Sequence, residues 1–299
     1  MVDFASVQYL RKMELVVGNS TDSLDLSALS VEFTIDKADS ETPNTGTIRI
    51  FNLADETVAK IQKEYRTVLL SAGYESNFGS IFHANIKKTT WGREGTETVL
   101  EIEAGDGDES YTTAIVSTTV AAGSTYKSNA KLAAEAMAGV EINWVTSGPS
   151  IEEIPDDKPL PRAKVMHGMA RDVLRNVGKN IDSQWSVQDG KVEMLANKSY
   201  RPGDAIVITS RNGMIDTPKR TEEGISLTTL LNPTLKIGYA IQIDEGRLPN
   251  AAAIDKQFDG LYKVIKISHT GAIRGNEWYS EIEAESIDQS GAATQVKSK

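Results

Sequence analysis

The sequence predicts a mainly β protein with α+β character, in which two similar small β-barrel domains flank a small α+β domain. The first observation is a repeat. Segments 80–104 and 260–284 align without a gap at a constant offset of 180 and share seven identities in 25 positions. The second is the apolar/polar alternation of strands toward both ends of the chain, and the third is helical spacing in the middle. The predicted domains are 1–105 (first barrel with one short helix), 106–200 (α+β), 201–290 (second barrel) and 291–299 (flexible tail).

Each copy of the repeat has the pattern strand, glycine-marked charged turn, strand, which is typical of a β-hairpin. The longest shared run is Glu-Ile-Glu-Ala, at 101–104 and again at 281–284. The isolated identities are Thr90/Thr270, Gly95/Gly275 and Glu97/Glu277. We interpret the two segments as a duplicated β unit. The alternative is that two unrelated amphipathic hairpins have reached the same pattern through composition alone.

In the first domain, alternation over 29–35 predicts a strand with one buried face. A polar loop over 36–46 follows, and then a strand over 47–51. Asn52 is the predicted N-cap of a short helix, because acidic residues follow it and lysines stand near the other end. A strand over 68–72 then leads into the first hairpin.

The middle domain begins after 105–109, a glycine and acid run that predicts a solvated linker. The spacing of its calcium-type ligands is incomplete. Further along, Asp189-Gly190 is the strongest short hairpin signal in the chain. The elements predicted around it are a helix from Ser124 to Gly139, a strand at 142–145, an extended connector over 148–161, a helix over 163–177, and hairpin strands at 184–188 and 191–195.

The last third returns to β structure. Unbroken alternation over 235–243 predicts the clearest strand of the chain. Turn signals at Asn212-Gly213 and Asn232-Pro233 precede it. A loop over 246–259 and the second hairpin complete the predicted barrel.

The bulk composition excludes several classes of protein. The 299 residues contain no cysteine, so disulfides, thiolate nucleophiles and cysteine-metal sites are absent. That absence fits a reducing cytoplasm and fits a virion protein equally. The net charge of −10 argues against nucleic-acid binding, because phosphate contacts require clustered Lys and Arg. Neither a signal peptide at the N-terminus nor a membrane-spanning apolar run is predicted.

A search for catalytic motifs finds no nucleophile elbow, HExxH, Walker loop or dinucleotide fingerprint. The three histidines are not at metal-ligand spacings. We expect His83 and His269 at strand or turn surfaces of the hairpins, and His167 on the polar face of the second helix. No catalytic, cofactor-binding or metal residue is therefore predicted, and no cofactor.

Paired carboxylates and aromatic residues were weighed as signs of sugar chemistry. The proline-flanked acids are Glu152, Glu153, Asp156 and Asp157. A glycosidase pair normally stands in a cleft with aromatic platforms, and this loop has no aromatic residue. Surface acids are the simpler interpretation. The tryptophans fall on predicted strands or turns and are interpreted as core or interface residues: Trp91, Trp144, Trp185 and Trp278.

A duplicated β-barrel unit separated by a small α+β domain, in an acidic, cysteine-free chain without catalytic motifs, resembles the baseplate hub protein of bacteriophage tails. The architecture is also similar to the hub part of type VI secretion spikes. The resemblance rests on segments 30–57, 165–195, 224–244 and 260–284, which include SVEFTIDKADSETPNTGTIRIFNLADET and GISLTTLLNPTLKIGYAIQID. These are structural signatures and none is a catalytic fingerprint.

The resemblance implies a homotrimer in which two barrels from each of three chains form a pseudo-sixfold ring. Its implied partners are the tail tube or a tube-initiator protein, the central spike, other baseplate proteins and the tape measure protein. DNA would pass through the channel without specific binding, and no membrane anchoring is implied. The implied location is the virion tail baseplate, assembled in the bacterial host cytoplasm. An acidic balance suits a channel through which DNA slides. Some relatives carry an inserted lysozyme or peptidase module or a β-prism after the second barrel, and neither is predicted in this sequence.

Two alternatives from other classes stand beside this expectation that the chain is not an enzyme. One is a tail-associated peptidoglycan hydrolase that uses paired acids. The other is a carbohydrate-binding module for host attachment, which would require exposed aromatic clusters.

Overall fold

The computed structural model describes residues 10–138, 159–197, 200–201, 204–210, 212–222, 224–243 and 258–287. Most of the described chain is β structure, as the sequence predicts. One 13-stranded sheet contains most strands, in the order β13-β14-β17-β16-β3-β4-β7-β6-β5-β1-β2, with β15 pairing with β16 and with β12. Two separate two-stranded sheets, β8-β9 and β10-β11, belong to the middle of the chain.

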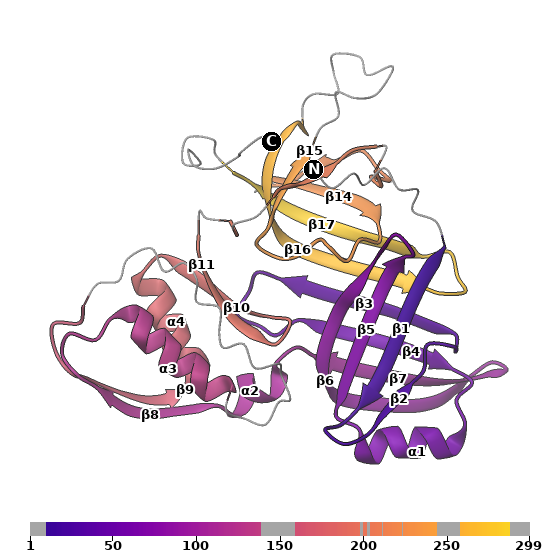
Figure 1. The fold of residues 1–299 in the computed structure, drawn as a ribbon, viewed down its shortest axis with the longest axis horizontal. Coiled ribbons are helices and arrows are strands. Elements are labelled where there is room, and N and C mark those ends of the chain that lie inside the picture. Colours follow the sequence, from indigo (N-terminus) through magenta and orange to yellow (C-terminus); the bar gives the residue numbers. More distant parts are fainter. Residues whose placement is uncertain are drawn as a thin grey trace.

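The first β unit consists of the strands at the indigo and purple end of the chain (Figure 1). They are β1 (Arg11–Gly18), β2 (Ser23–Asp25), β3 (Val31–Ala38), β4 (Thr45–Phe51), β5 (Thr67–Tyr74), β6 (Asn77–Glu94) and β7 (Glu97–Gly105). Alternate residues of β3 and β4 are buried, so one face of each covers a core and the other meets solvent. The strands predicted over 29–35, 47–51 and 68–72 are therefore confirmed.

The short helix α1 (Asp55–Glu64) packs Val58 and Ile61 beneath this unit. The prediction that Asn52 caps it is wrong. The N-cap is Ala54, which makes no side-chain cap bond. Asn52 instead lies in the left-handed region with φ 57°, where its side chain accepts a hydrogen bond from the Thr98 N–H at 3.3 Å. Its side chain is thereby used to hold the end of β4 against β7.

The second β unit contains β12 (Ile206–Ile208), β13 (Lys219–Arg220), β14 (Gly224–Leu230), β15 (Ala240–Ile243), β16 (Gly260–Ala272) and β17 (Trp278–Ser286). The strand predicted over 235–243 is wrong in its first half, because only the last four residues are extended. Gly238 has φ 79°, which breaks the strand, and its N–H donates to the Val264 carbonyl at 2.9 Å. The alternation reflects buried turn residues there: Leu235 and Ile237 are still in the core.

The two β units join edge to edge, which differs from the two small closed β-barrels that the sequence predicts. Among the residues described, neither unit closes on itself, and their strands form one continuous sheet. The reason is the length of β16. Its first half pairs with β15, and its second half, Lys266 to Ala272, pairs antiparallel with Ala38 to Glu32 of β3. Figure 1 shows the yellow strands of the second unit running into the indigo strands of the first.

The two repeated hairpins, β6-β7 and β16-β17, share a β-bulge at matching places. It lies between Ile86 and Lys88 in the first and between Val264 and Lys266 in the second. When the two bulges are superimposed, residues of β7 and β17 correspond at the predicted offset of 180 residues, whereas residues of β6 and β16 correspond at an offset of 178. The second turn is two residues longer than the first. The gapless alignment is therefore correct for the second strand and wrong for the first, so Thr90/Thr270 and Gly95/Gly275 are not equivalent positions.

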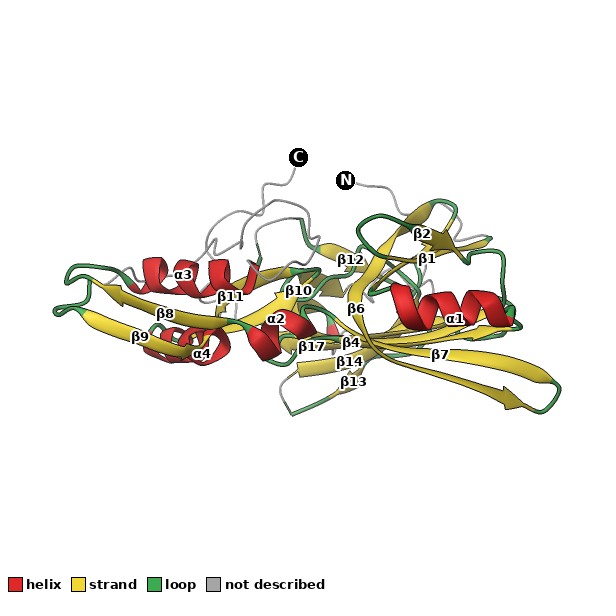
Figure 2. Cartoon of the chain, turned by 90° about the horizontal axis from the view of Figure 1, so that it is seen from below, coloured by secondary structure: helices red, strands yellow, loops and turns green. Residues whose placement is uncertain are grey.

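The middle domain lies to one side of the sheet (Figure 2). It contains α2 (Asp108–Thr113), β8 (Ile115–Val120), α3 (Tyr126–Ala138), β9 (Lys164–Met169), α4 (Ala170–Asn180), β10 (Ser183–Gln188) and β11 (Lys191–Ala196). The hairpin at Asp189-Gly190 is confirmed, with both residues at positive φ. The helix predicted over 163–177 is wrong in its first half, because β9 occupies 164–169 and pairs with β8.

Three hydrophobic cores follow this organisation. The first unit is centred on Ile35, Ile48, Leu70 and Ile102, the middle domain on Leu174 and Trp185, and the second unit on Ile241, Val264 and Ile282. The predicted strand at 142–145, the loop over 246–259 apart from its last two residues, the tail from 291 and most of the 148–161 connector lie outside the described residues.

Candidate assembly surface

The junction between the β units is the best-defined interface within the chain. Phe33 of β3 meets Trp278 of β17 edge to face, with ring centroids 5.7 Å apart. Gly271 of β16 lies against the Phe33 ring, and a Cβ there would stand 2.3 Å from that ring. Arg11 of β1 donates to the carbonyls of Gly275 (2.6 Å) and Asn276 (3.1 Å) in the turn that follows. The first unit therefore holds the turn of the second hairpin.

A buried ion pair reinforces this junction. Lys263 of β16 lies 2.9 Å from the Asp39 carboxylate, just beyond β3, and both side chains are less than a tenth exposed. Removing one member of a buried pair leaves an unpaired charge, which costs about 3–5 kcal/mol. Separating the two units at this pair would therefore cost more free energy than breaking a surface ion pair.

A second, partly buried network docks the turn of the β10-β11 hairpin against both units. Asp189 accepts from Lys37 Nζ at 2.6 Å and lies 3.5 Å from Lys236 Nζ of the second unit. The Gly190 N–H donates to Asp106 at 2.9 Å. Asn44 donates to the Val187 carbonyl (3.0 Å) and to Gln188 Oε1 (2.9 Å). One turn of the middle domain therefore contacts both β units.

The electrostatics of this network correct an expectation. The run 105–109 is not a solvated linker, because Asp106 is only 1% exposed. Burial raises the pKa of the Asp106 carboxyl to about 7, while nearby Lys37 opposes the shift. Burial also works against the ionised form of Asp189, but Lys37 and Lys236 outweigh it and lower its pKa. Near neutral pH Asp106 is therefore partly protonated, whereas Asp189 is ionised, which reduces the repulsion between the two carboxyl groups.

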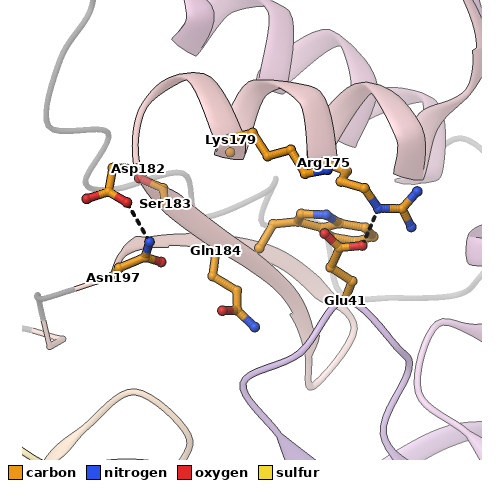
Figure 3. A pocket seen from close by; sticks show the side chains of 9 residues that line it. Glu41, Arg175, Lys179, Asp182, Ser183, Gln184 and Asn197 are labelled. Carbon is orange, nitrogen blue, oxygen red and sulfur yellow. Dashed lines mark hydrogen bonds and ion pairs between the residues drawn. The ribbon is translucent and has the colours of Figure 1, made fainter.

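A pocket of about 470 Å³ opens between α4, β10 and the β3-β4 loop (Figure 3). Arg175 Nε donates to Glu41 at 2.6 Å across it, and Asn197 donates to Asp182 at 2.7 Å. Arg175 also contacts Asp172 at 2.8 Å. Glu41 and Arg175 pair with each other and Asp182 accepts from Asn197, so this pocket marks a seam between the middle domain and the first unit.

One half of β6 contrasts with this closed surface. Residues 77–85 pair with β5, but beyond the bulge the described strands pair with β6 on the β7 side only. This open part of β6, residues 87–94, projects together with the first part of β7 in Figure 2. At the far end of the sheet, β13 pairs with β14 alone within the same part of the chain. Unpaired edges of this kind are templates for another strand.

The histidines lie in different places from those predicted. His269 is in the core, 1% exposed and 2.8 Å from Ser280 Oγ, and burial lowers its pKa to about 3. The surface prediction for it is therefore wrong. His167 lies on β9, not on a helix, exposed and 3.3 Å from Ser117 Oγ. His83 is half-buried on β6. Burial lowers the pKa of His83 and of His269, and the Asp189 carboxylate opposes the shift in both.

Of the aromatic candidates, Trp185 and Trp278 are core residues, as expected, and Trp91 is half-buried against the first core. The acids between 152 and 157, and Trp144, lie outside the described residues. Within the described ranges, no cluster of three or more His, Asp or Glu side chains could hold a metal ion. Likewise, none of the described helices is long and apolar enough to cross a membrane.

Sequence reasoning missed the residues that build the junction, chiefly Lys263, Asp39 and Asp106. Each is a charged residue whose burial depends on segments far apart in the chain. The hairpin signal at Asp189 was found, but nothing local indicates that its turn docks between two other units.

The fold is similar to that of several solved tail proteins. It is similar to the 43 kDa tail protein of prophage MuSo2 from Shewanella oneidensis, with TM-score 0.62, 7% identity, and 93% of this chain and 98% of that one covered. A tail protein from Neisseria meningitidis MC58 gives TM-score 0.60 at 10% identity, with 93% and 97% covered. The Escherichia coli c3393 protein, a type VI secretion component described as similar to phage T4 gp27 and gp5, gives 0.56 at 10%, with 94% and 78% covered. At such identities the likeness concerns the fold alone.

The sequence itself identifies the family. The Baseplate hub gp41 family matches residues 12–283, nearly the whole chain. The chain belongs to this family, and it is a structural component of a phage tail. No curated protein sequence matches it.

Proposed function

We propose that three copies of this chain form the central hub of a tail baseplate, and that the hub joins the hexameric tail tube to the trimeric spike. The observation that carries the proposal is the repeated strand order within the chain. In each unit a hairpin (β3-β4, β13-β14) is followed by a strand (β5, β15) and a second hairpin (β6-β7, β16-β17), with the same antiparallel pairings.

This likeness supports an internal duplication with the unit boundaries 1–105, 106–200 and 201–290. Two β units per chain and three chains give six similar units, which is the number needed to face a sixfold tube. The spike then meets the same object through its true threefold symmetry. A single β unit per chain would leave the two symmetries unmatched.

The ring would enclose a channel through which DNA passes without specific binding. The net charge of −10 supports this part of the proposal, because an acidic lumen repels phosphates. The chain would act in the virion, after assembly in the host cytoplasm, with tube, spike and other baseplate proteins as partners and with no enzymatic step of its own.

The test is the mass of the full-length protein in solution, measured by light scattering alone and after mixing with its tube and spike partners. We expect three copies per particle, and images of the particle with six similar densities around a channel. A chain that stays monomeric with both partners present would contradict the hub function. Clearing of a cell-wall suspension would favour the hydrolase alternative, and sugar-dependent thermal shifts would favour the carbohydrate module.

A further inference from the structure

The open part of β6 has a closed counterpart in the same chain. Counted from the bulge, residues 88–94 of β6 correspond to 266–272 of β16, which pair with β3. The β16 stretch is mostly buried by that pairing, whereas the β6 stretch is mostly exposed. Among the described strands, the equivalent stretch is thus paired on both edges in the second unit and on one edge in the first.

The counterpart of β3 can be counted in the same way. Thr47 of β4 and Ser226 of β14 each stand opposite the matching glutamate of the hairpin, Glu103 or Glu283. Their next neighbours are Thr34 on β3 and Lys219 on β13. Strand β13 therefore occupies the place of β3, and it also has an open edge among the described strands.

We propose that the open part of β6 pairs antiparallel with the β13 edge of a second copy of this chain, in the register of the β16-β3 junction. Trp91 then stands opposite Arg220, Thr90 opposite Thr221, and Gly92 opposite Lys219. This rests on the proposed hub function and names the contact that closes its ring.

The chemistry of the two edges fits this direction. The Arg220 guanidinium comes to the face of Trp91, where a cation and an aromatic ring attract each other. Glu222 falls diagonally across from Lys87 and Lys219 diagonally across from Glu94, which are unlike charges, whereas Arg220 falls diagonally across from Arg93. Within one chain Lys87 also pairs with Asp108, and Glu94 with Arg49. A parallel alignment would bring the lysines of β6 toward Lys219 and Arg220.

A buried polar atom near the start of the open part adds an independent sign of incompleteness. Asn85 takes the place that Lys263 occupies in the second hairpin. It is 9% exposed, and its Oδ1 has no hydrogen-bond donor in the described part of the chain. Buried amide oxygens without a donor are uncommon in finished structures.

The absence of cysteine makes disulfide trapping a clean test. Thr90→Cys with Thr221→Cys joins a pair equivalent to Ser268 and Asp36. Asp39 N–H donates to the Ile265 carbonyl and Ile273 N–H to the Val31 carbonyl, so 39/265 and 31/273 are hydrogen-bonded pairs. Every second pair between these two is hydrogen-bonded, and the Ser268/Asp36 pair is one of the non-hydrogen-bonded pairs. Their Cα atoms lie about 4.5 Å apart, within disulfide range.

Under mild oxidation of the assembled protein, Thr90→Cys/Thr221→Cys should give covalent dimers and trimers on a denaturing gel, reversed by a reductant. Two matched controls define the readout. Ser268→Cys/Asp36→Cys should form the bond within one chain, and Thr89→Cys/Thr221→Cys, on opposite faces, should form little. A second variant, Arg220→Ala, should weaken self-association about two- to fivefold without changing unfolding of the chain, whereas Lys127→Ala on α3 should change neither.

The outcomes separate this inference from the proposed function. Trimers by light scattering without cross-links in the Thr90→Cys/Thr221→Cys protein would overturn the register while leaving the hub intact. Equal cross-linking in the Thr90→Cys/Thr221→Cys and Thr89→Cys/Thr221→Cys proteins would also overturn the proposed register. Absence of any self-association, with or without tube and spike partners, would overturn both.

Discussion

The hairpins β6-β7 and β16-β17 share a bulge, a strand order and an ion pair, yet only one is closed on both sides. Lys88 lies 3.1 Å from Glu103, and Lys266 lies 3.1 Å from Glu283, each pair directly after the bulge. Beyond that point β16 is covered by β3, and β6 is not. The comparison teaches that the local structure is set by the hairpin itself, whereas its burial is set by what lies beside it.

The largest expected effect breaks the closed side. Asp39→Ala leaves Lys263 buried and unpaired, so we expect a loss of about 3–5 kcal/mol of unfolding free energy. Urea unfolding followed by tryptophan fluorescence measures it. The matched control is Glu103→Ala, whose partner Lys88 is largely exposed and whose loss should cost under about 1 kcal/mol. Equal losses in the two variants would show that the junction is not a buried interface.

A steric version of the same comparison uses two glycines. In Gly271→Val the added side chain meets the Phe33 ring, so we expect a destabilisation of up to about 3 kcal/mol. Gly92→Val in β6 should be tolerated in the isolated chain, because nothing lies within 4 Å of a Cβ at that position. Thermal unfolding of both variants measures the difference. A Gly92 variant as unstable as the Gly271 variant would mean that the open edge is occupied.

The residues that follow the hairpins also differ. Asp106 follows β7 and is buried, while its counterpart Ser286 is exposed. The folded-state pKa of Asp106, about 7, lies above its unfolded value of 3.8. Folding therefore favours the protonated form, and this contribution to stability declines as pH rises from about 4 to about 7. We expect Asp106→Asn to remove this decline, which is on the order of 4 kcal/mol.

That change is measured as the difference in melting temperature between the two proteins at pH 4.5, 6 and 7.5. Asp106→Asn should gain relative to the natural chain as pH rises. Ser286→Ala serves as the control and should follow the natural chain at every pH. A constant difference between Asp106→Asn and the natural chain would contradict a titration of Asp106 in this range.

The smallest expected effect tests the shared feature. Lys88→Ala and Lys266→Ala each remove an exposed ion pair after a bulge, so each should cost under about 1 kcal/mol. Because the two pairs have the same length and similar exposure, the losses should agree within about 0.5 kcal/mol. Unfolding at low and high salt measures both, and the small effects should shrink with salt. A much larger loss of unfolding free energy for one lysine than for the other would show that the two hairpins differ even at this shared ion pair.

The sequence by itself determined the local structure wherever one segment decides it. The strands around 29–35 and 47–51 and the turn at Asp189-Gly190 follow from side-chain alternation and from residues that accept positive φ. It also carried the family, through patterns spread over most of the chain. Where neighbours decided, it misled: 164–169 looked helical but is a strand because β8 pairs with it.

Only the tertiary structure decided which charges are buried and how the two units meet. Asp106, Lys263 and His269 look like surface residues in the sequence, because a charge alone does not reveal which distant segments will cover it. The pairing of β16 with β3 joins residues more than two hundred positions apart. Such contacts depend on the arrangement of the whole sheet, since no local pattern specifies the strand that lies beside an edge.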